Sequence, residues 1–187
     1  MTQIALFGTS ADPPTSGHQA ILLWLSQRFD KVVVWASDNP FKTHQTLLEH
    51  RMAMLSLLIE EINAPTKNIA LHPELSSRRT LETLNRAKNY WSDAQYTLVV
   101  GSDLIQQIPQ WYQIETLLKQ VELLIIPRPS YPVIETDLDH LKKLGATLTI
   151  ATITGLPVSS SHYRQTGNIE VLTTPVQDYI NREKLYE

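Results

Sequence analysis

The chain has no cysteine among its 187 residues. This absence excludes disulfide bonds, a cysteine nucleophile and metal sites built from thiolates. The six histidines form neither a His-x-His pair nor a His-Glu-x-x-His motif, so the usual spacing of a histidine metal site is also missing. We therefore expect no metal ion held by protein side chains.

The net charge is small, and long apolar runs are absent. The formal net charge is −3 and no basic block occurs, which disfavours nucleic acid as a partner. No apolar run approaches the roughly 20 residues that span a bilayer, and the start lacks the basic and apolar regions of a secretory signal. We expect a cytoplasmic protein without a membrane partner.

Six short apolar runs are present, and each is typical of a strand buried on both faces. They cover residues 4–7, 32–35, 69–71, 97–100, 123–126 and 148–150. Between and after them, apolar residues recur at helical spacing. Helices are expected from His18 to Phe29, from Arg51 to Ile62, over 80–90, 113–118, 138–144 and 174–185, and after Ser159.

This alternation of strand and helix predicts an α/β fold. Its form is a Rossmann-like, doubly wound parallel sheet with right-handed crossovers. The sequence shows no repeat, low-complexity tract or linker, so we expect a single domain over residues 1–187.

The stretch Gly8–His18 joins the first strand to the first helix through a turn rich in glycine and proline. Backbone N–H groups at a helix start are unpaired and carry partial positive charge, which suits phosphate. His18 can donate there to a phosphoryl oxygen, Thr15 adds a hydroxyl, and Gly8 allows the backbone to approach a ligand closely. By itself, the stretch also fits a helix-terminal histidine without chemistry.

The stretch Val158–Arg164 is a second candidate. A serine can cap the new helix by accepting from backbone N–H groups, and Arg164 lies four residues after Ser160 on the same face. Hydroxyls, free N–H groups and a guanidinium together can clamp a polyphosphate. The alternative is an ordinary serine cap followed by a solvated arginine.

Both stretches resemble the paired signatures of the nucleotidyltransferase superfamily, Thr15-x-Gly17-His18 first and Val158–Arg164 far downstream. The segments between them, together with Trp111, are similar to the bacterial nicotinate-nucleotide adenylyltransferase family. Those segments are Asn39–Lys42, Arg51–Met54, Thr80–Leu84 and Gly101–Leu104. The resemblance covers nearly the whole chain. It implies adenylyl transfer from ATP to nicotinate mononucleotide, which forms nicotinate adenine dinucleotide and pyrophosphate in NAD biosynthesis.

The resemblance also implies which residues act. The catalytic groups are expected at His18, Lys42 and Arg164. ATP is expected at Gly8, Thr9, Ser10, Thr15, Gly17, His18, Gly101, Asp103, Ser159, Ser160 and Arg164. The acceptor is expected at Lys42, Arg79, Thr80, Trp111 and Arg128. Mg²⁺ is expected to bind through the ATP phosphates rather than through a cage of protein side chains. Formation of a homo-oligomer is left open.

The positions of the polar motifs along the chain agree with this assignment, because each motif follows one of the predicted strands. In open parallel sheets, ligands bind beyond the carboxyl ends of the strands, so these motifs are expected at one edge of the sheet. Asp103 can accept from a ribose hydroxyl or can cap a helix. Trp111 can stack on the pyridine ring or can belong to the core.

The chain departs from the family pattern at several positions. Phe41 stands where a histidine is usual, and Arg78-Arg79-Thr80 replaces Ser-Tyr-Thr beside the nicotinate carboxylate. An arginine there can pair with a carboxylate, or the two arginines can be solvated. The alternatives to nicotinate mononucleotide transfer are use of nicotinamide mononucleotide, use of another acceptor, or a nucleotide-binding regulator without turnover.

Overall fold

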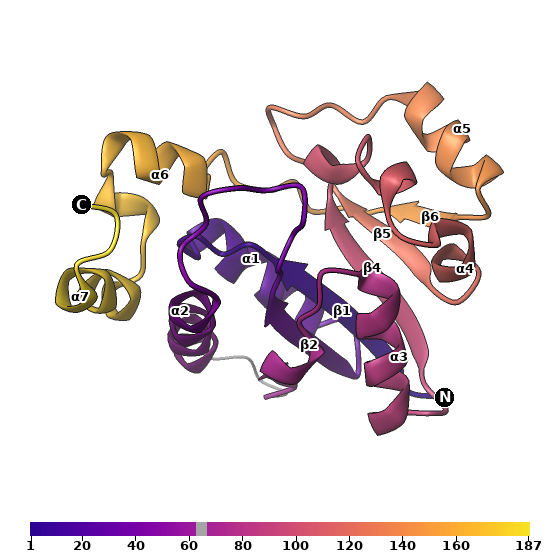
Figure 1. The fold of residues 1–187 in the computed structure, drawn as a ribbon, viewed down its shortest axis with the longest axis horizontal. Coiled ribbons are helices and arrows are strands. Elements are labelled where there is room, and N and C mark those ends of the chain that lie inside the picture. Colours follow the sequence, from indigo (N-terminus) through magenta and orange to yellow (C-terminus); the bar gives the residue numbers. More distant parts are fainter. Residues whose placement is uncertain (63–66) are drawn as a thin grey trace.

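A computed structural model describes residues 1–62 and 67–187 of the chain. Six parallel strands form one sheet in the order β3-β2-β1-β4-β5-β6 (Figure 1). Their bounds are β1 Gln3–Thr9, β2 Lys31–Ala36, β3 Ile69–Leu71, β4 Gln95–Gly101, β5 Glu122–Ile126 and β6 Thr147–Ile150. The predicted doubly wound α/β sheet is therefore confirmed.

Helices connect the strands and extend the chain beyond β6. The α-helices are α1 Ser16–Ser26, α2 Leu48–Glu61, α3 Thr80–Tyr90, α4 Ile114–Leu118, α5 Glu135–Lys143, α6 Ser160–Thr166 and α7 Thr174–Glu183. Short 3₁₀ helices are η1 Pro73–Leu75, η2 Ser102–Leu104, η3 Ile108–Gln110 and η4 Ile169–Val171. Right-handed crossovers put α1 and α2 on one face of the sheet and α3, α4 and α5 on the other. Helix α7 packs against α2 (Figure 1).

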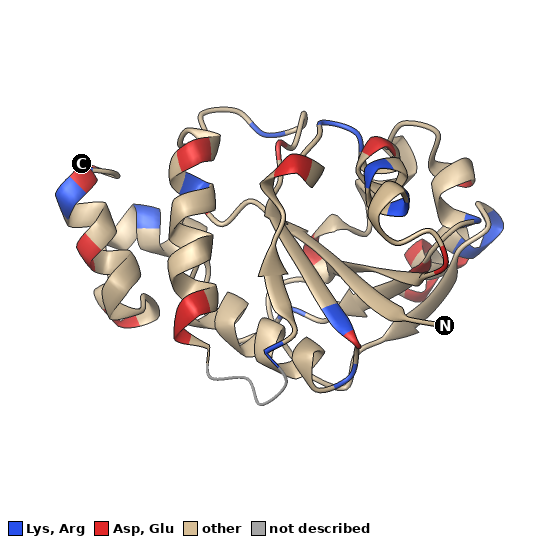
Figure 2. Ribbon diagram, turned by 90° about the horizontal axis from the view of Figure 1, so that it is seen from below, with Lys and Arg blue, Asp and Glu red and all other residues tan. Residues whose placement is uncertain are grey.

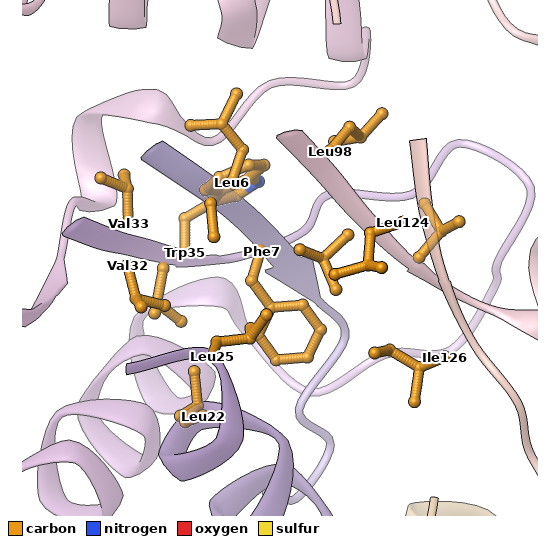
Figure 3. Close-up of a cluster of buried hydrophobic side chains, with 14 of the residues drawn as sticks. Leu6, Phe7, Leu22, Leu25, Val32, Val33, Trp35, Leu98, Leu124 and Ile126 are labelled. Carbon is orange, nitrogen blue, oxygen red and sulfur yellow. The ribbon is translucent and has the colours of Figure 1, made fainter. Parts of the chain in front are cut away.

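The core forms because the central strands are apolar on both faces. Phe7 points toward Leu22 and Leu25 of α1, whereas its neighbour Leu6 points to the opposite face, where Trp35 lies (Figure 3). Successive side chains of a strand alternate between faces, so an uninterrupted apolar strand needs helices on both sides. Charged residues stay on helices, loops and strand ends (Figure 2).

Several element boundaries differ from the prediction. Helix α1 ends at Ser26, before Phe29, and α2 begins at Leu48 rather than Arg51. Helix α5 begins at Glu135, because acidic residues in a first turn favour a helix start. Helix α7 ends at Glu183, because Lys184 adopts a left-handed conformation with φ of 53°.

The sheet topology leaves a crevice beyond the carboxyl ends of β1 and β4. From these neighbouring central strands the chain departs to opposite faces, which is where open α/β sheets bind ligands. Within residues 1–62 and 67–187, no helix is both long and apolar enough to cross a membrane.

Candidate active site

Polar side chains from five loops meet at this crevice, and we call them the polar cluster. It combines three basic groups with a histidine, one carboxylate and one hydroxyl: Lys42, Arg128, Arg164, His18, Asp103 and Ser10. Sequence-distant residues come together because each follows the carboxyl end of a parallel strand. As expected from the sequence, these motifs lie together at one edge of the sheet.

His18 lies in the first turn of α1 and helps to cap it. The backbone N–H of Thr15 donates to His18 Nδ1 over 2.9 Å, and Thr15 Oγ1 accepts from the N–H of Gly17 over 3.2 Å. Because Nδ1 is an acceptor, the neutral ring carries its proton on Nε2, which lies 3.0 Å from Thr9 Oγ1. His18 therefore presents an N–H donor to the crevice.

The pKa of His18 is lowered to about 4, first by burial and then by the positive charges of Arg128 and Lys42. Both causes disfavour an imidazolium. At neutral pH the ring is thus an uncharged donor, and the positive charge of the cluster comes from Lys42, Arg128 and Arg164.

Lys42 reaches the cluster from the loop after β2, where its Nζ donates to Ser10 Oγ over 2.8 Å. Burial lowers the pKa of this amine, and the nearby Arg164 and Arg128 lower it further, while Asp103 and Asp12 oppose the shift. An ammonium held among other cations favours the arrival of an anion, because an anion relieves their mutual repulsion.

Asp103 and Arg128 form an ion pair across the ends of β4 and β5, with Arg128 Nη1 3.2 Å from Asp103 Oδ2. Gly101 makes this arrangement possible. A β-carbon at position 101 would lie 2.3 Å from Asp103 Oδ1 and 3.3 Å from Arg128 Cδ. Both residues are partly exposed at the crevice, so their remaining hydrogen-bonding capacity can serve a ligand.

Helix α6 is fastened to the turn after β1. Arg164 Nη1 donates to the carbonyl of Asp12 over 2.6 Å, and Ser160 Oγ donates to the carbonyl of Pro13 over 2.7 Å. Ser159 caps α6 by accepting from the N–H of His162. The two candidate stretches of the sequence thus form one unit, and several predicted hydroxyl donors are already bonded to the chain itself.

The predicted glycines have packing roles in this unit. Gly17 is buried, and a β-carbon there would lie 3.1 Å from Val158 Cγ2 and 3.3 Å from Thr15 Oγ1. A β-carbon on Gly8 would lie 2.6 Å from the indole of Trp35. Both glycines are therefore needed for close packing against protein side chains, and the expected approach of a ligand to Gly8 stays a prediction.

Arg51 connects the loops that carry the cluster, although sequence reasoning assigned it no role. Its side chain is only 2% exposed and donates to the carbonyls of Thr46, Ser10 and Ser37 over 2.7–3.1 Å. The available signal was its spacing, because Arg51 lies four and seven residues before Leu55 and Leu58 and so shares the apolar face of α2. A buried cation needs partners, so such a residue indicates carbonyl-lined loops nearby.

A cavity of about 570 Å³ opens beside the polar cluster. Its aromatic walls are Trp35, Phe41, Trp111 and Tyr112, and residues from the start of α3 close another side. Of the residues predicted to bind the acceptor, Arg79, Thr80 and Trp111 line this cavity, whereas Lys42 and Arg128 lie in the polar cluster. Trp111 itself lies between η3 and α4, rather than within a helix.

The cavity and the cluster are joined through shared loops. Gly8, Phe41 and Leu104 line the cavity, and their chain neighbours Thr9, Lys42 and Asp103 face the cluster. A ligand with a flat ring and a phosphate can therefore place the ring in the cavity and the phosphate at the cluster.

The two arginines before α3 have different surroundings. Arg79 lies 3.6 Å from Glu82 and stacks over the ring of Tyr112, with its guanidinium carbon 4.1 Å from the centroid. Arg78 also lines the cavity but forms no ion pair with any residue that the structure describes. Arg78 is thus the guanidinium available to a ligand, while Arg79 joins two walls of the cavity.

Metal ligands do not gather within the described residues: no group of three His, Asp or Glu side chains that could hold an ion is found there. The two carboxylates nearest the cluster already have partners. Asp103 pairs with Arg128, and Asp12 accepts from Thr46 and Tyr186.

Comparison with known proteins identifies the family. Residues 6–166 match the model of a family described as cytidylyltransferase-like. A Synechocystis sp. protein named "Probable nicotinate-nucleotide adenylyltransferase" is 46% identical, with 98% of each chain covered. A Bacillus cereus protein of the same name is 29% identical over the full length of both chains.

Solved structures share the fold. A Plasmodium falciparum nicotinic acid mononucleotide adenylyltransferase, in complex with NaAD, superimposes with a TM-score of 0.83 at 24% identity. The match covers 100% of this chain and 98% of that one. The same enzyme in complex with APC gives a TM-score of 0.81.

Proposed function

Because the chain belongs to the cytidylyltransferase-like family, and within it to the nicotinate-nucleotide adenylyltransferases, we propose that it transfers an adenylyl group from ATP to nicotinate mononucleotide. The products are nicotinate adenine dinucleotide and pyrophosphate, and the proposed compartment is the cytoplasm. One observation carries the proposal most directly: a cationic cluster at a helix start adjoins an aromatic cavity.

The reaction needs no nucleophile from the protein. A phosphate oxygen of the mononucleotide attacks the α-phosphorus of ATP in line, a new P–O bond forms, and the bond to pyrophosphate breaks. Charge is redistributed onto non-bridging and leaving oxygens, so catalysis depends on positioning and on donors aimed at those oxygens. The hydroxyls of Ser159 and Ser160, which cap and fasten α6, agree with donor and scaffold roles.

His18 is proposed to donate from Nε2 to a non-bridging oxygen of the transferred phosphate. Its proton is held on Nε2 by the contact of Thr15 N–H with Nδ1. When ATP enters, Nε2–H exchanges Thr9 Oγ1 for the phosphoryl oxygen. A neutral donor strengthens its hydrogen bond as charge develops in the transition state.

Lys42, Arg128 and Arg164 are proposed to neutralise the triphosphate and the acceptor phosphate. Arg164 is fixed by the Asp12 carbonyl, and Lys42 is held by Ser10, so both cations are positioned before substrate binds. Preorganised charge costs no rearrangement during the reaction, which is why it is effective in catalysis.

The acceptor ring is proposed to enter the cavity and stack on Trp111. The nicotinate carboxylate then lies near the start of α3, where Thr80 begins the helix and no side chain caps it. Helix N–H groups and Arg78 are the donors proposed to read this carboxylate.

Mg²⁺ is proposed to accompany ATP, bound through phosphate oxygens and water. The residues present fit this arrangement, because the cluster offers donors to phosphate while both nearby carboxylates already have protein partners. The ion would supply further charge neutralisation of the polyphosphate.

The test is release of pyrophosphate from ATP with each acceptor in turn. We expect release with nicotinate mononucleotide, less with nicotinamide mononucleotide, and none without an acceptor. Release with neither pyridine mononucleotide but with another acceptor phosphate would move the protein to a different transferase branch. ATP binding without any release would instead indicate a nucleotide-binding regulator.

A further inference from the structure

Asp12 is a buried carboxylate on which three separate segments converge. It is 4% exposed, and its Oδ2 accepts from the backbone N–H of Thr46 over 3.1 Å. Its Oδ1 accepts from the hydroxyl of Tyr186 over 2.5 Å. Its own carbonyl accepts from Arg164. None of these contacts uses Asp12 as a ligand for substrate.

The turn that contains Asp12 and two of the segments that contact it each carry a proposed catalytic group. The turn that contains Asp12 leads directly into the α1 cap, which holds His18. The loop that ends near Thr46 carries Lys42, and α6 carries Arg164. A displacement of Asp12 would therefore reach all three groups at once.

Tyr186 is well placed to fix Asp12. Its ring packs edge-on against Tyr163 of α6, with centroids 5.7 Å apart. Burial, followed by the hydrogen bond to Asp12, raises the pKa of the phenol, so its hydroxyl remains a donor throughout the physiological range. The ring is thus held by packing, and the hydroxyl is directed at Asp12.

We propose that Tyr186 is a positioning residue for adenylyl transfer, acting through its hydrogen bond to Asp12. The inference rests on the proposed function, because it concerns the groups assigned to that reaction. The hydroxyl fixes the carboxylate, and the carboxylate fixes the phosphate-facing turn relative to Lys42 and Arg164. Small displacements of catalytic groups cost large factors in rate, even when the cause lies outside the site.

The direct test is Tyr186→Phe, which removes only the hydroxyl and leaves the ring against Tyr163. We expect kcat to fall roughly tenfold and the Kd for ATP to rise several-fold. The melting temperature should change by no more than about 4 °C. Tyr90→Phe is the matched control, because Tyr90 is 58% exposed and remote from the cluster. It should match the wild type in all three measurements.

Asp12→Ala provides the coupling test, because alanine has no oxygen that can accept from the Tyr186 hydroxyl. If Tyr186 acts through the carboxylate, Tyr186→Phe should change kcat less than twofold in an Asp12→Ala background. Two effects that multiply independently would overturn the proposal. So would a lowered melting temperature with unchanged kcat and unchanged ATP Kd, because that result describes a purely structural tyrosine.

The assay separates this inference from the proposed function. Turnover of the wild type with nicotinate mononucleotide tests the function, and the ratio of variant to wild type tests Tyr186. If the wild type made no dinucleotide, calorimetric ATP binding would still decide, since an unchanged Kd in Tyr186→Phe contradicts the positioning role.

Discussion

His18 uses one ring nitrogen to hold the α1 cap, and the other lies beside Thr9 at the crevice, where we propose that it meets phosphate. This division decides its tautomer, and burial, followed by the positive charges of Arg128 and Lys42, lowers the pKa of the ring and keeps it neutral. A residue that looks like a simple helix cap thereby becomes an oriented donor. The two interpretations of Gly8–His18, a helix-terminal histidine and a donor to phosphate, are therefore compatible, because the capping contact orients the Nε2–H group.

His18→Ala should lower kcat by at least about 100-fold, since loss of one preorganised transition-state donor costs this much. The Kd for ATP should change far less, because Lys42, Arg128 and Arg164 remain. Steady-state kinetics and calorimetric titration with ATP measure the two quantities. His140→Ala, at an exposed histidine of α5, is the control. A kcat within a few-fold of the wild type would remove His18 from the mechanism.

Substitutions of Arg78 and Arg79 are expected to have different effects on the choice of acceptor. Arg78→Gln should reduce the preference for nicotinate over nicotinamide mononucleotide by roughly tenfold, because one charge-assisted hydrogen bond is worth about 1.5–3 kcal/mol. Arg79→Gln should raise the KM for both acceptors and leave their ratio unchanged, because it loosens the contact with Tyr112. The ratio of kcat/KM values measures the preference.

If neither substitution alters that ratio, the N–H groups at the start of α3 read the carboxylate alone. If Arg79→Gln lowers the ratio and Arg78→Gln does not, the assignment of the two arginines is reversed. Each variant serves as the control for the other, since both remove one positive charge from the same segment.

At the scale of elements, the site depends on the seam between α1 and the segment before α6. Gly17 packs against Val158, directly before the cap of α6. A side chain at position 17 would push this segment away and disturb the contacts of Ser160 and Arg164 with the turn. Because Gly17 has no side chain, the two signature stretches can pack closely against each other.

Gly17→Ala should weaken ATP binding and lower kcat, each by roughly tenfold, although alanine by itself favours the helix over glycine by up to about 1 kcal/mol. Combining it with Val158→Ala should restore much of the activity, because the second change removes the methyl group that lies 3.1 Å away. Leu23→Ala, at an exposed position of the same helix, controls for helix propensity. Failure of Val158→Ala to rescue would locate the steric conflict elsewhere.

At the scale of the whole molecule, His18 makes stability depend on pH. Its pKa falls from 6.5 in the unfolded chain to about 4 in the fold, so the unfolded chain binds more protons between these values. Protonation of His18 therefore costs no stability above about pH 7, and the free energy of unfolding falls as the pH drops from about 6.5 to 4. The maximum loss is on the order of 3 kcal/mol.

Urea unfolding of the wild type and of His18→Gln, measured at intervals between pH 4 and 7.5, isolates this contribution. The free energy of unfolding should fall more steeply with acid in the wild type than in the variant. Parallel curves would show that His18 does not carry the effect. The corresponding His140→Gln variant should follow the wild type.

The sequence predicted the sheet well because strand burial and helical periodicity are local signals. It also predicted the edge at which His18, Lys42 and Arg164 would meet, since parallel strands fix that edge. It missed Arg51 and Tyr186, whose partners are backbone carbonyls and a buried carboxylate far along the chain. It also could not separate Arg78 from Arg79, because a stacking contact with Tyr112 depends on tertiary structure.

The bond between Arg164 and the carbonyl of Asp12 joins residues 152 positions apart. During synthesis, a chain that has emerged only as far as β5 holds the His18 turn but lacks the arginine that is proposed to bind the triphosphate. ATP can stabilise a protein only by binding its folded form. Nucleotide that is held by this arginine can therefore stabilise the protein only after α6 has been made and has packed on the turn.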